Sequence, residues 1–350
     1  MAKRKLKPKV LILGCGGTIA SVPNARGLLV PAKTAKELVS LVPSLSEHAV
    51  LDIKQLENRD SSELNSSHWT KFAMAVHHAI LSGKYDGIIL THGTDTMAYS
   101  ATAVSLIFGT KLPIPVIFTG SQLGLVSFGT DARSNLERSL QALLAAREQN
   151  VAEVMIVFDD VVLRGCRAVK TSEAEFHAFD SPAFPPLARI LATGSRFIRD
   201  AHRARSLKAF REANFSFMFG RGVVVYDLVP GLEPGIVFDT IKNGKCQGLI
   251  LRSLGIGNVP SSDEFSLIPC IEEAASLQIP VVITTKFAGG TTHAGIYEPG
   301  RLALDAGAIE SGDLTDVATQ VKIMWLLGHG VRAKGIRQAL LRPVAGEVSR

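Results

Sequence analysis

Short apolar runs alternate with longer stripes of helical periodicity along most of the chain. Seven runs are typical of parallel strands buried on both faces, at residues 10–13, 87–90, 116–119, 154–158, 223–228, 249–251 and 281–284. Three stripes between or after them predict helices, carried by Trp69, Phe72, Ala73, Val76 and Ile80, by Leu136, Leu140, Leu143 and Leu144, and by Val317, Val321, Met324 and Trp325. Ser66 or Ser67 is the expected N-cap of the first helix, and the third should end at Gly328. This alternation predicts an α/β fold with parallel sheets.

The periodicity weakens from about residue 181 to residue 222. Pro182, Pro185 and Pro186 open this region, and a cluster of basic residues follows before the next strand signal. We therefore expect two Rossmann-like domains with parallel sheets. The larger N-terminal domain spans residues 1–195, a basic connector spans 196–221, and a smaller C-terminal domain spans 222–350.

Composition and charge narrow the class of protein. With 46% hydrophobic and 20% charged residues, the 350-residue chain can build full cores. The formal charge of +6 is concentrated in residues 1–9 and 196–221, so we expect no nucleic-acid-binding face. The longest uncharged stretch, 112–130, is broken by prolines and glycines, and the apolar run at 10–13 is short for a secretion signal. These features predict a soluble protein without membrane contact.

The number and spacing of the cysteines bear on the redox state of the compartment. There are four, and none is spaced as in a CxxC pair. The histidines likewise show no metal-ligand spacing, so we expect no metal site and a reducing, cytoplasmic setting.

Two predicted strands end in unusual polar turns. The run at 10–13 leads into glycines and then Thr18, a hydroxyl nucleophile among backbone N–H groups that could serve as oxyanion donors. The run at 87–90 leads into a turn that includes Thr94 and Asp95, where a helix cap alone would need one such residue. The first turn does not meet the GxGxxG register of nucleotide-binding loops. Because ligands bind at the carboxyl ends of parallel strands, both turns are candidate site elements.

These segments resemble the signature motifs of one enzyme family. GGTIA at 16–20 and THGTDTMAYSA at 91–101 are similar to the two motifs of the bacterial-type L-asparaginases, the asparaginase/glutaminase amidohydrolases. VIFTGSQ at 116–122 and VYDLVPGL at 225–232 extend the resemblance over nearly the whole chain. With no secretion signal, and with Asp-Ser-Ser at 60–62, the chain is similar to the cytoplasmic type I branch. The resemblance implies hydrolysis of the L-asparagine side-chain amide to L-aspartate and ammonia, without metal or cofactor.

The resemblance also implies roles for particular residues. Thr18 matches the nucleophile that forms an acyl-enzyme, and Thr94, Asp95 and Lys170 match a hydrogen-bonded set that manages protons. Asp60, Ser61 and Ser62 match the segment that binds the substrate, the serines holding its α-carboxylate, while Asp95 is matched to its α-ammonium. Burial would lower the pKa of Lys170 towards that of a useful base. His92, although it lies in a motif, is expected to be a structural hydrogen-bonder.

One position departs from the family pattern. Leu28 and Leu29 stand in the loop after GGTIA, where many members carry a tyrosine that contacts the nucleophile. Tyr297 matches a C-terminal tyrosine that related enzymes supply from a neighbouring subunit, although an ordinary surface tyrosine explains it equally well. Asn258 is a further candidate for contact with a partner's site. A homodimer or homotetramer is therefore expected.

Other functions stay open at this point. One is a glutaminase-type, ammonia-releasing amidohydrolase, or the related subunit of a glutamyl-tRNA amidotransferase, which carries an extra domain before its GGT motif. Here nine residues precede the first predicted strand. Another is a non-catalytic amino-acid-binding protein, since a fold does not guarantee activity. Asparagine and glutamine differ by one methylene, worth roughly 1–3 kcal/mol in a pocket, so the sequence leaves the preference undecided.

Overall fold

The computed structural model describes residues 6–31, 33–287 and 289–349. They form two compact units, one running up to Ser181 and again over Pro185–Phe217, the other comprising Pro182–Phe184 and the described residues from Met218 onward. All seven predicted strands are present within three residues of their expected bounds. No helix among the described residues has the length and apolar character needed to span a bilayer.

The N-terminal unit is built on an eight-stranded sheet, ordered β12-β11-β8-β7-β6-β5-β1-β4. Its strands are β1 (Lys9–Gly16), β4 (Val50–Arg59), β5 (Gly87–Thr91), β6 (Val116–Thr119), β7 (Val154–Phe158), β8 (Val161–Arg164), β11 (Ala188–Leu191) and β12 (Gly194–Ser195). Two small antiparallel pairs accompany it, β2 (Ser21–Pro23) with β3 (Leu29–Pro31), and β9 (Val169–Lys170) with β10 (Phe179–Asp180).

The predicted α/β fold is confirmed, and the sheet of this unit is mixed where a parallel sheet was expected. Strands β4, β1, β5, β6 and β7 are parallel, whereas β8, β11 and β12 are antiparallel to their neighbours. The reason is local: only Asp159 and Asp160 separate β7 from β8, and a two-residue link joins antiparallel strands, whereas a parallel pair needs a long crossover.

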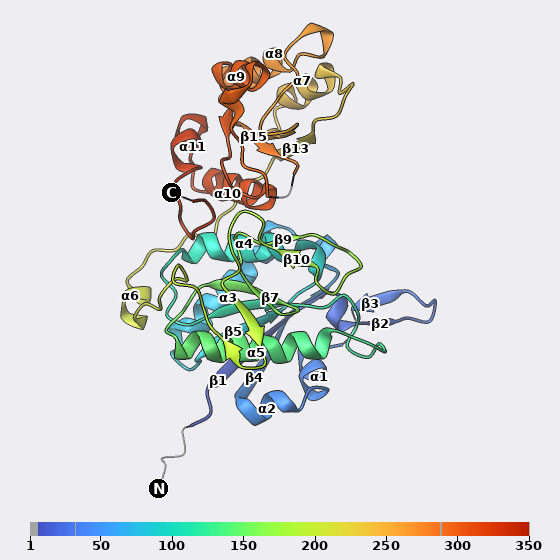
Figure 1. The fold of residues 1–350 in the computed structure, drawn as a ribbon, viewed down its shortest axis with the longest axis vertical. Coiled ribbons are helices and arrows are strands. Elements are labelled where there is room, and N and C mark those ends of the chain that lie inside the picture. The colour runs from blue at the N-terminus through green and yellow to red at the C-terminus, as the bar shows by residue number, and fades with distance from the viewer. Residues whose placement is uncertain (1–5, 32, 288, 350) are drawn as a thin grey trace. The chain divides into compact units, whose positions relative to one another are not determined.

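Helices cover the sheet. They are α1 (Ala35–Ser40), α2 (Ser44–His48), α3 (Ser66–Leu81), α4 (Met97–Phe108), α5 (Ala132–Glu148) and α6 (Leu207–Arg211). The sheet lies between α4 and α5 in Figure 1. The first predicted helix is α3, but its N-cap is Asn65 instead of Ser66 or Ser67, because the Asn65 side chain accepts a hydrogen bond from the Ser67 N–H. Single 3₁₀ turns η1 (Thr18–Ala20), η2 (Ser61–Glu63) and η3 (Thr94–Thr96) follow β1, β4 and β5.

The C-terminal unit has a parallel four-stranded sheet, ordered β13-β14-β15-β16. Its elements are β13 (Val223–Asp227), α7 (Pro234–Lys242), β14 (Gly248–Ser253), η4 (Asp263–Phe265), α8 (Ile268–Ser276), β15 (Val281–Thr285), η5 (Ala294–Ile296), α9 (Glu298–Asp305), β16 (Ile309–Glu310), α10 (Asp316–Gly328) and α11 (Ala333–Ala339). Leu249 and Leu251 face one buried cluster while Ile250 faces another. Both faces are covered, which explains why the strands read as continuous apolar runs.

The basic segment after β12 packs on the N-terminal unit as far as Phe217. Its arginines reach the carboxyl ends of helices. Arg203 donates to the carbonyl of Gln149 at the end of α5, and Arg211 to that of Leu81 at the end of α3. These bonds satisfy carbonyls that a helix end leaves without partners and place positive charge at the negative end of the helix dipole.

Candidate active site

Three adjacent strands of the N-terminal sheet end level with one another. In the register, Gly14 of β1 pairs with Thr91 of β5, and Gly16 pairs with Arg59 of β4. Each strand then continues into a 3₁₀ turn, η2 after β4, η1 after β1 and η3 after β5. The sheet therefore delivers Ser61, Thr18 and Thr94 to the same edge, the carboxyl edge at which open α/β sheets bind ligands.

Glycines let these turns touch. A Cβ placed on Gly17 would lie 2.2 Å from the Cα and N of Gly93. A Cβ on Gly93 would in turn lie 2.6 Å from the Cβ and Oγ of Ser61. Gly17 has φ 85°, in the left-handed region, and precedes Thr18 directly. The turn that carries Thr18 is thus in contact with the turn that carries Thr94 through backbone, and the Ser61 side chain packs against the same glycine, Gly93.

Lys170 comes from a distant segment and meets the second turn. Its Nζ donates to Thr94 Oγ1 at 2.9 Å and to Asp95 Oδ1 at 2.6 Å. Thr94 is 4% exposed, and the Lys170 side chain is 19% exposed. The Asp95 carboxylate is open to solvent at 61%. The Lys170 amine thereby joins a buried hydroxyl and an exposed carboxylate through two hydrogen bonds.

The predicted substrate-binding segment is held by internal hydrogen bonds. Asp60 Oδ1 accepts from the backbone N–H of Ser62 at 2.9 Å and from its hydroxyl at 2.6 Å. The hydroxyl and N–H of Ser62 lower the pKa of Asp60 because they favour its ionised form. Ser61 is 3% exposed and packs against Gly93. Of the two serines, Ser61 lies against the second motif, and Ser62 is engaged by Asp60.

His92 is placed for structure, as expected from its position beside a tight turn. Its ring is fully buried, with Nδ1 2.8 Å from the Gly93 carbonyl and Nε2 2.8 Å from the Ser100 hydroxyl. Because a carbonyl only accepts, Nδ1 carries the hydrogen and Nε2 accepts from Ser100. Burial lowers the pKa of His92 to about 4, so the ring is neutral near pH 7.

Three further candidates are carried by other segments of the chain. Leu28 is at the end of the turn between β2 and β3 and is 62% exposed. Tyr297 precedes α9 in the C-terminal unit and is 55% exposed. Asn258 closes a tight turn with Leu254, and its Oδ1 is buried without a hydrogen-bond partner among the residues that the structure describes. The roles suggested for Tyr297 and Asn258 involve a second chain and stay predictions.

Two residues belong to the site region without a role assigned from sequence. The Thr96 hydroxyl donates to the carbonyl of Ser61 at 2.8 Å and so ties η3 to η2. Gln122, from the VIFTGSQ segment, donates through Nε2 to the carbonyls of Ser172 and Glu175, just after Lys170. Thr96 stood within a quoted motif, but only the folded chain shows what its hydroxyl contacts.

One group of side chains has the composition of a metal site. Ligand atoms of Asp159, Asp160 and His177 lie within 4.8 Å of one another. Both carboxylates are already paired, Asp159 with Arg138 at 2.7 Å and Asp160 with Arg189 at 3.0 Å. Two guanidinium groups at hydrogen-bond distance oppose a further cation there, and we assign no metal to this group.

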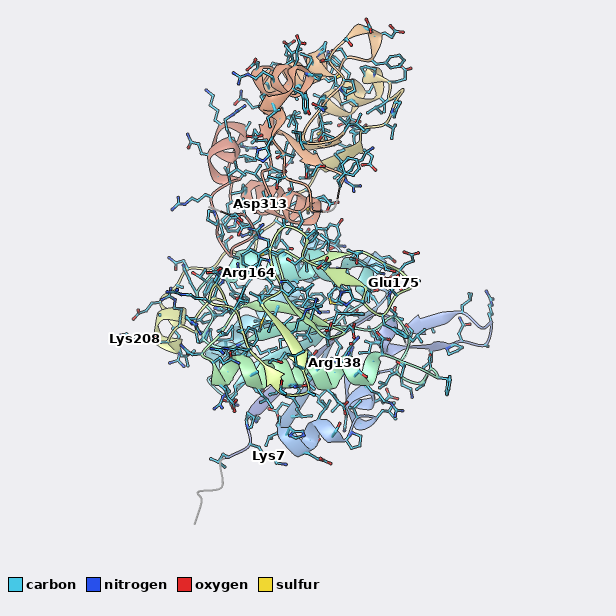
Figure 2. The ribbon with its side chains drawn as sticks, in the orientation of Figure 1. Lys7, Arg138, Arg164, Glu175, Lys208 and Asp313 are labelled. Atoms are coloured by element: carbon cyan, nitrogen blue, oxygen red, sulfur yellow. The ribbon has the colours of Figure 1, made fainter. Side chains whose placement is uncertain are left out.

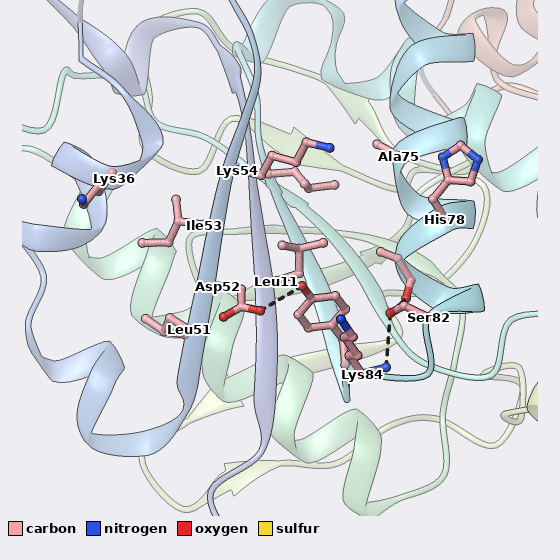
Figure 3. Close-up of a pocket in the computed structure, with 13 residues that line it drawn as sticks. Leu11, Lys36, Leu51, Asp52, Ile53, Lys54, Ala75, His78, Ser82 and Lys84 are labelled. Atoms are coloured by element: carbon pink, nitrogen blue, oxygen red, sulfur yellow. Dashed lines mark hydrogen bonds between the residues drawn. The ribbon is translucent and has the colours of Figure 1, made fainter.

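A groove of about 750 Å³ lies beside the edge strand β4 and helix α3, lined by residues such as Leu11, Asp52, Lys54 and His78 (Figure 3). None of the motif residues lines it. Asp52 is held by Lys9 at 2.8 Å and by the Tyr85 hydroxyl at 2.9 Å. The Lys9 hydrogen bond, foremost, lowers the pKa of that carboxyl. The candidate site therefore remains at the strand ends.

Comparison with known families covers most of the chain. The model of the asparaginase N-terminal domain matches residues 9–203, and that of the glutaminase/asparaginase C-terminal domain matches residues 222–340. The chain belongs to the asparaginase/glutaminase family. It is accordingly an asparaginase-family amidohydrolase, and the family resemblance seen in its motifs is confirmed.

Similar members of this family carry two different names. A glutamyl-tRNA(Gln) amidotransferase subunit from Aeropyrum pernix is 35% identical over 97% of this chain and 79% of its own length. The L-asparaginase of Thermococcus kodakarensis is 32% identical, and its solved structure superposes with a TM-score of 0.87 over 98% of this chain and 99% of that one. L-asparaginase I from Vibrio cholerae is 26% identical, with a TM-score of 0.82 over 98% of this chain and 100% of that one.

Proposed function

We propose that the protein hydrolyses L-asparagine to L-aspartate and ammonia through an acyl-enzyme on Thr18. One observation carries the proposal: Lys170 bridges Thr94 and Asp95 directly beside the glycine contact that brings in the Thr18 turn. A nucleophilic hydroxyl, a proton-handling pair and an anionic anchor thus meet at one strand edge. This combination serves acyl transfer without a metal or an organic cofactor.

The chemistry divides into two balanced steps. As Thr18 Oγ bonds to the amide carbon, its proton passes through the Thr94–Lys170 pair to the leaving nitrogen, the C–N bond breaks and ammonia departs. Water then attacks the ester, its proton returns to Thr18, and aspartate is released. The substrate's α-ammonium pairs with Asp95, and its α-carboxylate lies at Ser61 and Ser62, which leaves the amide facing Thr18.

We also propose that the working form is a homo-oligomer in which Tyr297 of a second copy assists Thr18. Leu28 stands in the loop where a tyrosine would otherwise do so. Exposed apolar side chains on loops of the N-terminal unit, including Val126, Phe128 and Phe176, support burial against another chain. For the compartment we propose the cytoplasm, because all four cysteines are free thiols.

Glutamine is the second candidate substrate. The relative from Aeropyrum pernix is named as an amidotransferase subunit, and the longer amide differs by a single methylene. The structural likeness to two L-asparaginases favours asparagine. Steady-state ammonia release from each amide, compared as kcat/KM, decides between them, and a higher value for glutamine would reverse our assignment.

Substitution of the nucleophile tests the reaction itself. Thr18→Ala should abolish ammonia release from both amides while leaving the fold intact, because only a hydroxyl and a methyl group are removed. Thr193→Ala, an exposed threonine in the turn between β11 and β12, is the matched control and should keep full activity. Wild-type protein that binds asparagine without releasing ammonia would instead identify a non-catalytic amino-acid-binding protein. Full turnover by Thr18→Ala would remove the nucleophile assignment.

A further inference from the structure

Lys170 is not carried by the large sheet. It ends β9, which pairs with β10 as a separate two-stranded ribbon, Lys170 lying opposite Phe179. An isolated pair of strands is marginally stable in water and depends on what it packs against. The position of the Lys170 amine therefore depends on the contacts that hold this ribbon and the loop 171–178 between its strands.

The loop is ordered by its own backbone. The N–H of Thr171 donates to the carbonyl of Ala178 at 2.8 Å, which adds one backbone hydrogen bond to the ribbon. The Ser172 hydroxyl accepts from the N–H groups of Ala174 and Glu175 at 3.2 and 3.0 Å. These bonds shape the loop, but they do not attach it to the rest of the unit.

Gln122 attaches the first half of the loop through its bonds to the Ser172 and Glu175 carbonyls. Two further contacts attach the second half of the loop and β10 at the end of β7. The buried rings of Phe158 and Phe179 lie 5.0 Å apart, between β7 and β10. One residue beyond β7, Asp159 Oδ2 lies 3.2 Å from Nδ1 of His177. Because a carboxylate only accepts, Nδ1 carries a hydrogen and donates it to Asp159. The contact between the two phenylalanine rings is apolar and non-directional, whereas the hydrogen bond from His177 to Asp159 fixes the orientation of the group that makes it.

Asp159 is itself held in place. It lies in the two-residue turn between β7 and β8 with φ 48°, a conformation in which aspartate is more frequent than most side chains. Its N–H donates to Asn135 Oδ1 at 3.0 Å, and its Oδ1 accepts from Arg138 at 2.7 Å. Asn135 is 1% exposed on α5 and also donates to the Gly120 carbonyl at the end of β6. The carboxylate thus offers a fixed point to the separate ribbon.

We propose that His177 is a positioning residue for Lys170, an inference that rests on the proposed function. By donating to Asp159 it fixes the far end of the loop 171–178, and the ribbon transmits that constraint to the amine that meets Thr94 and Asp95. The histidine touches neither substrate nor the reacting atoms. The group that resembles a metal site is accordingly a tether, with its carboxylates shared among two arginines and one histidine.

The test compares two variants at this position. His177→Ala removes the donor, and kcat on asparagine should fall roughly tenfold with KM nearly unchanged, because small misplacements of a catalytic group cost rate. His177→Asn keeps an N–H near the place of Nδ1 and should restore most of the rate. His78→Ala, an exposed histidine on α3, is the matched control and should behave as wild type. Wild-type kcat in His177→Ala, or equal losses in both variants, would overturn the proposal.

Hydrogen exchange gives a readout that does not depend on turnover. Amides of residues 171–178 should exchange faster in His177→Ala than in wild type, and at nearly wild-type rates in His177→Asn. Unchanged exchange in His177→Ala would also overturn the proposal. If wild-type protein released no ammonia from either amide, the proposed function would fail, while the exchange experiment would still decide whether His177 tethers the loop.

Discussion

Two glycines govern how closely the backbones of the candidate site approach. Gly17 and Gly93 face each other without side chains, and a single added methyl on Gly17 would meet backbone atoms at 2.2 Å. Backbone has little freedom to withdraw, unlike the end of a flexible side chain. The short distance between the turns that carry Thr18 and Thr94 therefore requires glycine at both positions.

The variant Gly17→Ala tests this requirement. We expect a loss of roughly 3 kcal/mol of unfolding free energy, from overpacking added to the strain of a left-handed residue, together with loss of amide hydrolysis. Gly194→Ala separates the two effects, because Gly194 has φ 105° with open space around its Cβ and should cost only about 1 kcal/mol. Urea titration measures both values. Equal losses of unfolding free energy in the two variants would show that backbone strain alone, and not the close approach to Gly93, explains the glycine at position 17.

The buried His92 makes stability depend on pH. Its pKa is about 4 in the folded protein against 6.5 as the ordinary value, so the unfolded chain binds the proton first as pH falls. The contribution of His92 to the unfolding free energy is present above pH 6.5 and is lost progressively down to pH 4. At pH 5 the loss is about 2 kcal/mol. His92→Gln should remove this part of the pH dependence. Urea titrations of both proteins at pH 7 and pH 5 test this prediction. If the wild type and the variant lost the same unfolding free energy between pH 7 and pH 5, the assignment to His92 would be contradicted.

At the scale of elements, the basic segment 196–217 has a structural use. It crosses the carboxyl ends of α3 and α5, where Arg211 and Arg203 donate to terminal carbonyls. Lys208, in contrast, projects from α6 at 84% side-chain exposure (Figure 2). The basic cluster seen in the sequence is in part a set of helix caps.

This difference can be measured. Arg203→Gln and Arg211→Gln should each lower the unfolding free energy by about 0.5 kcal/mol, since a cation at a helix carboxyl end contributes that much at the surface. The losses should shrink in high salt, which screens the dipole. Lys208→Gln, without a helix carbonyl to cap, should leave the urea midpoint unchanged. A loss at Lys208 as large as at the arginines would argue for a general charge effect.

Some elements were readable from the sequence and others were not. The seven predicted strands and the three predicted helices are present, because their apolar periodicity reports burial directly. Strand β4 was not predicted, since it lies at the sheet edge and its half-exposed residues form no continuous apolar run. The antiparallel direction of β8 depends on the short Asp159–Asp160 link, which apolar periodicity does not register.

At the scale of the molecule, we propose a site that draws on two chains. Thr18 and Lys170 belong to one unit, and Tyr297 belongs to the other. If Tyr297 acts on the Thr18 of a partner, two inactive variants can complement each other. In a mixed dimer of Thr18→Ala and Tyr297→Phe, one of the two sites retains every required side chain.

Mixing these variants after dissociation should restore about a quarter of wild-type ammonia release, as random pairing into symmetric dimers predicts. A mixture of Thr18→Ala with Lys170→Ala is the control and should stay inactive. One chain supplies both residues to a given site, so every site in a mixed dimer lacks one of them. Wild-type activity in Tyr297→Phe alone, or no recovery in the mixture of Thr18→Ala with Tyr297→Phe, would show that Tyr297 is an ordinary surface tyrosine.

The sequence by itself determined the family and predicted which residues carry the chemistry, because the motifs around Thr18 and Thr94 are local and the strands before them are marked by their apolar runs. Only the tertiary structure decided that the Lys170 amine, 76 residues from Thr94, donates to its hydroxyl, and that two glycines let the turns touch. Contacts between distant segments follow from sheet order and loop anchoring. These depend on the packing of the whole unit, which no local pattern of residues records.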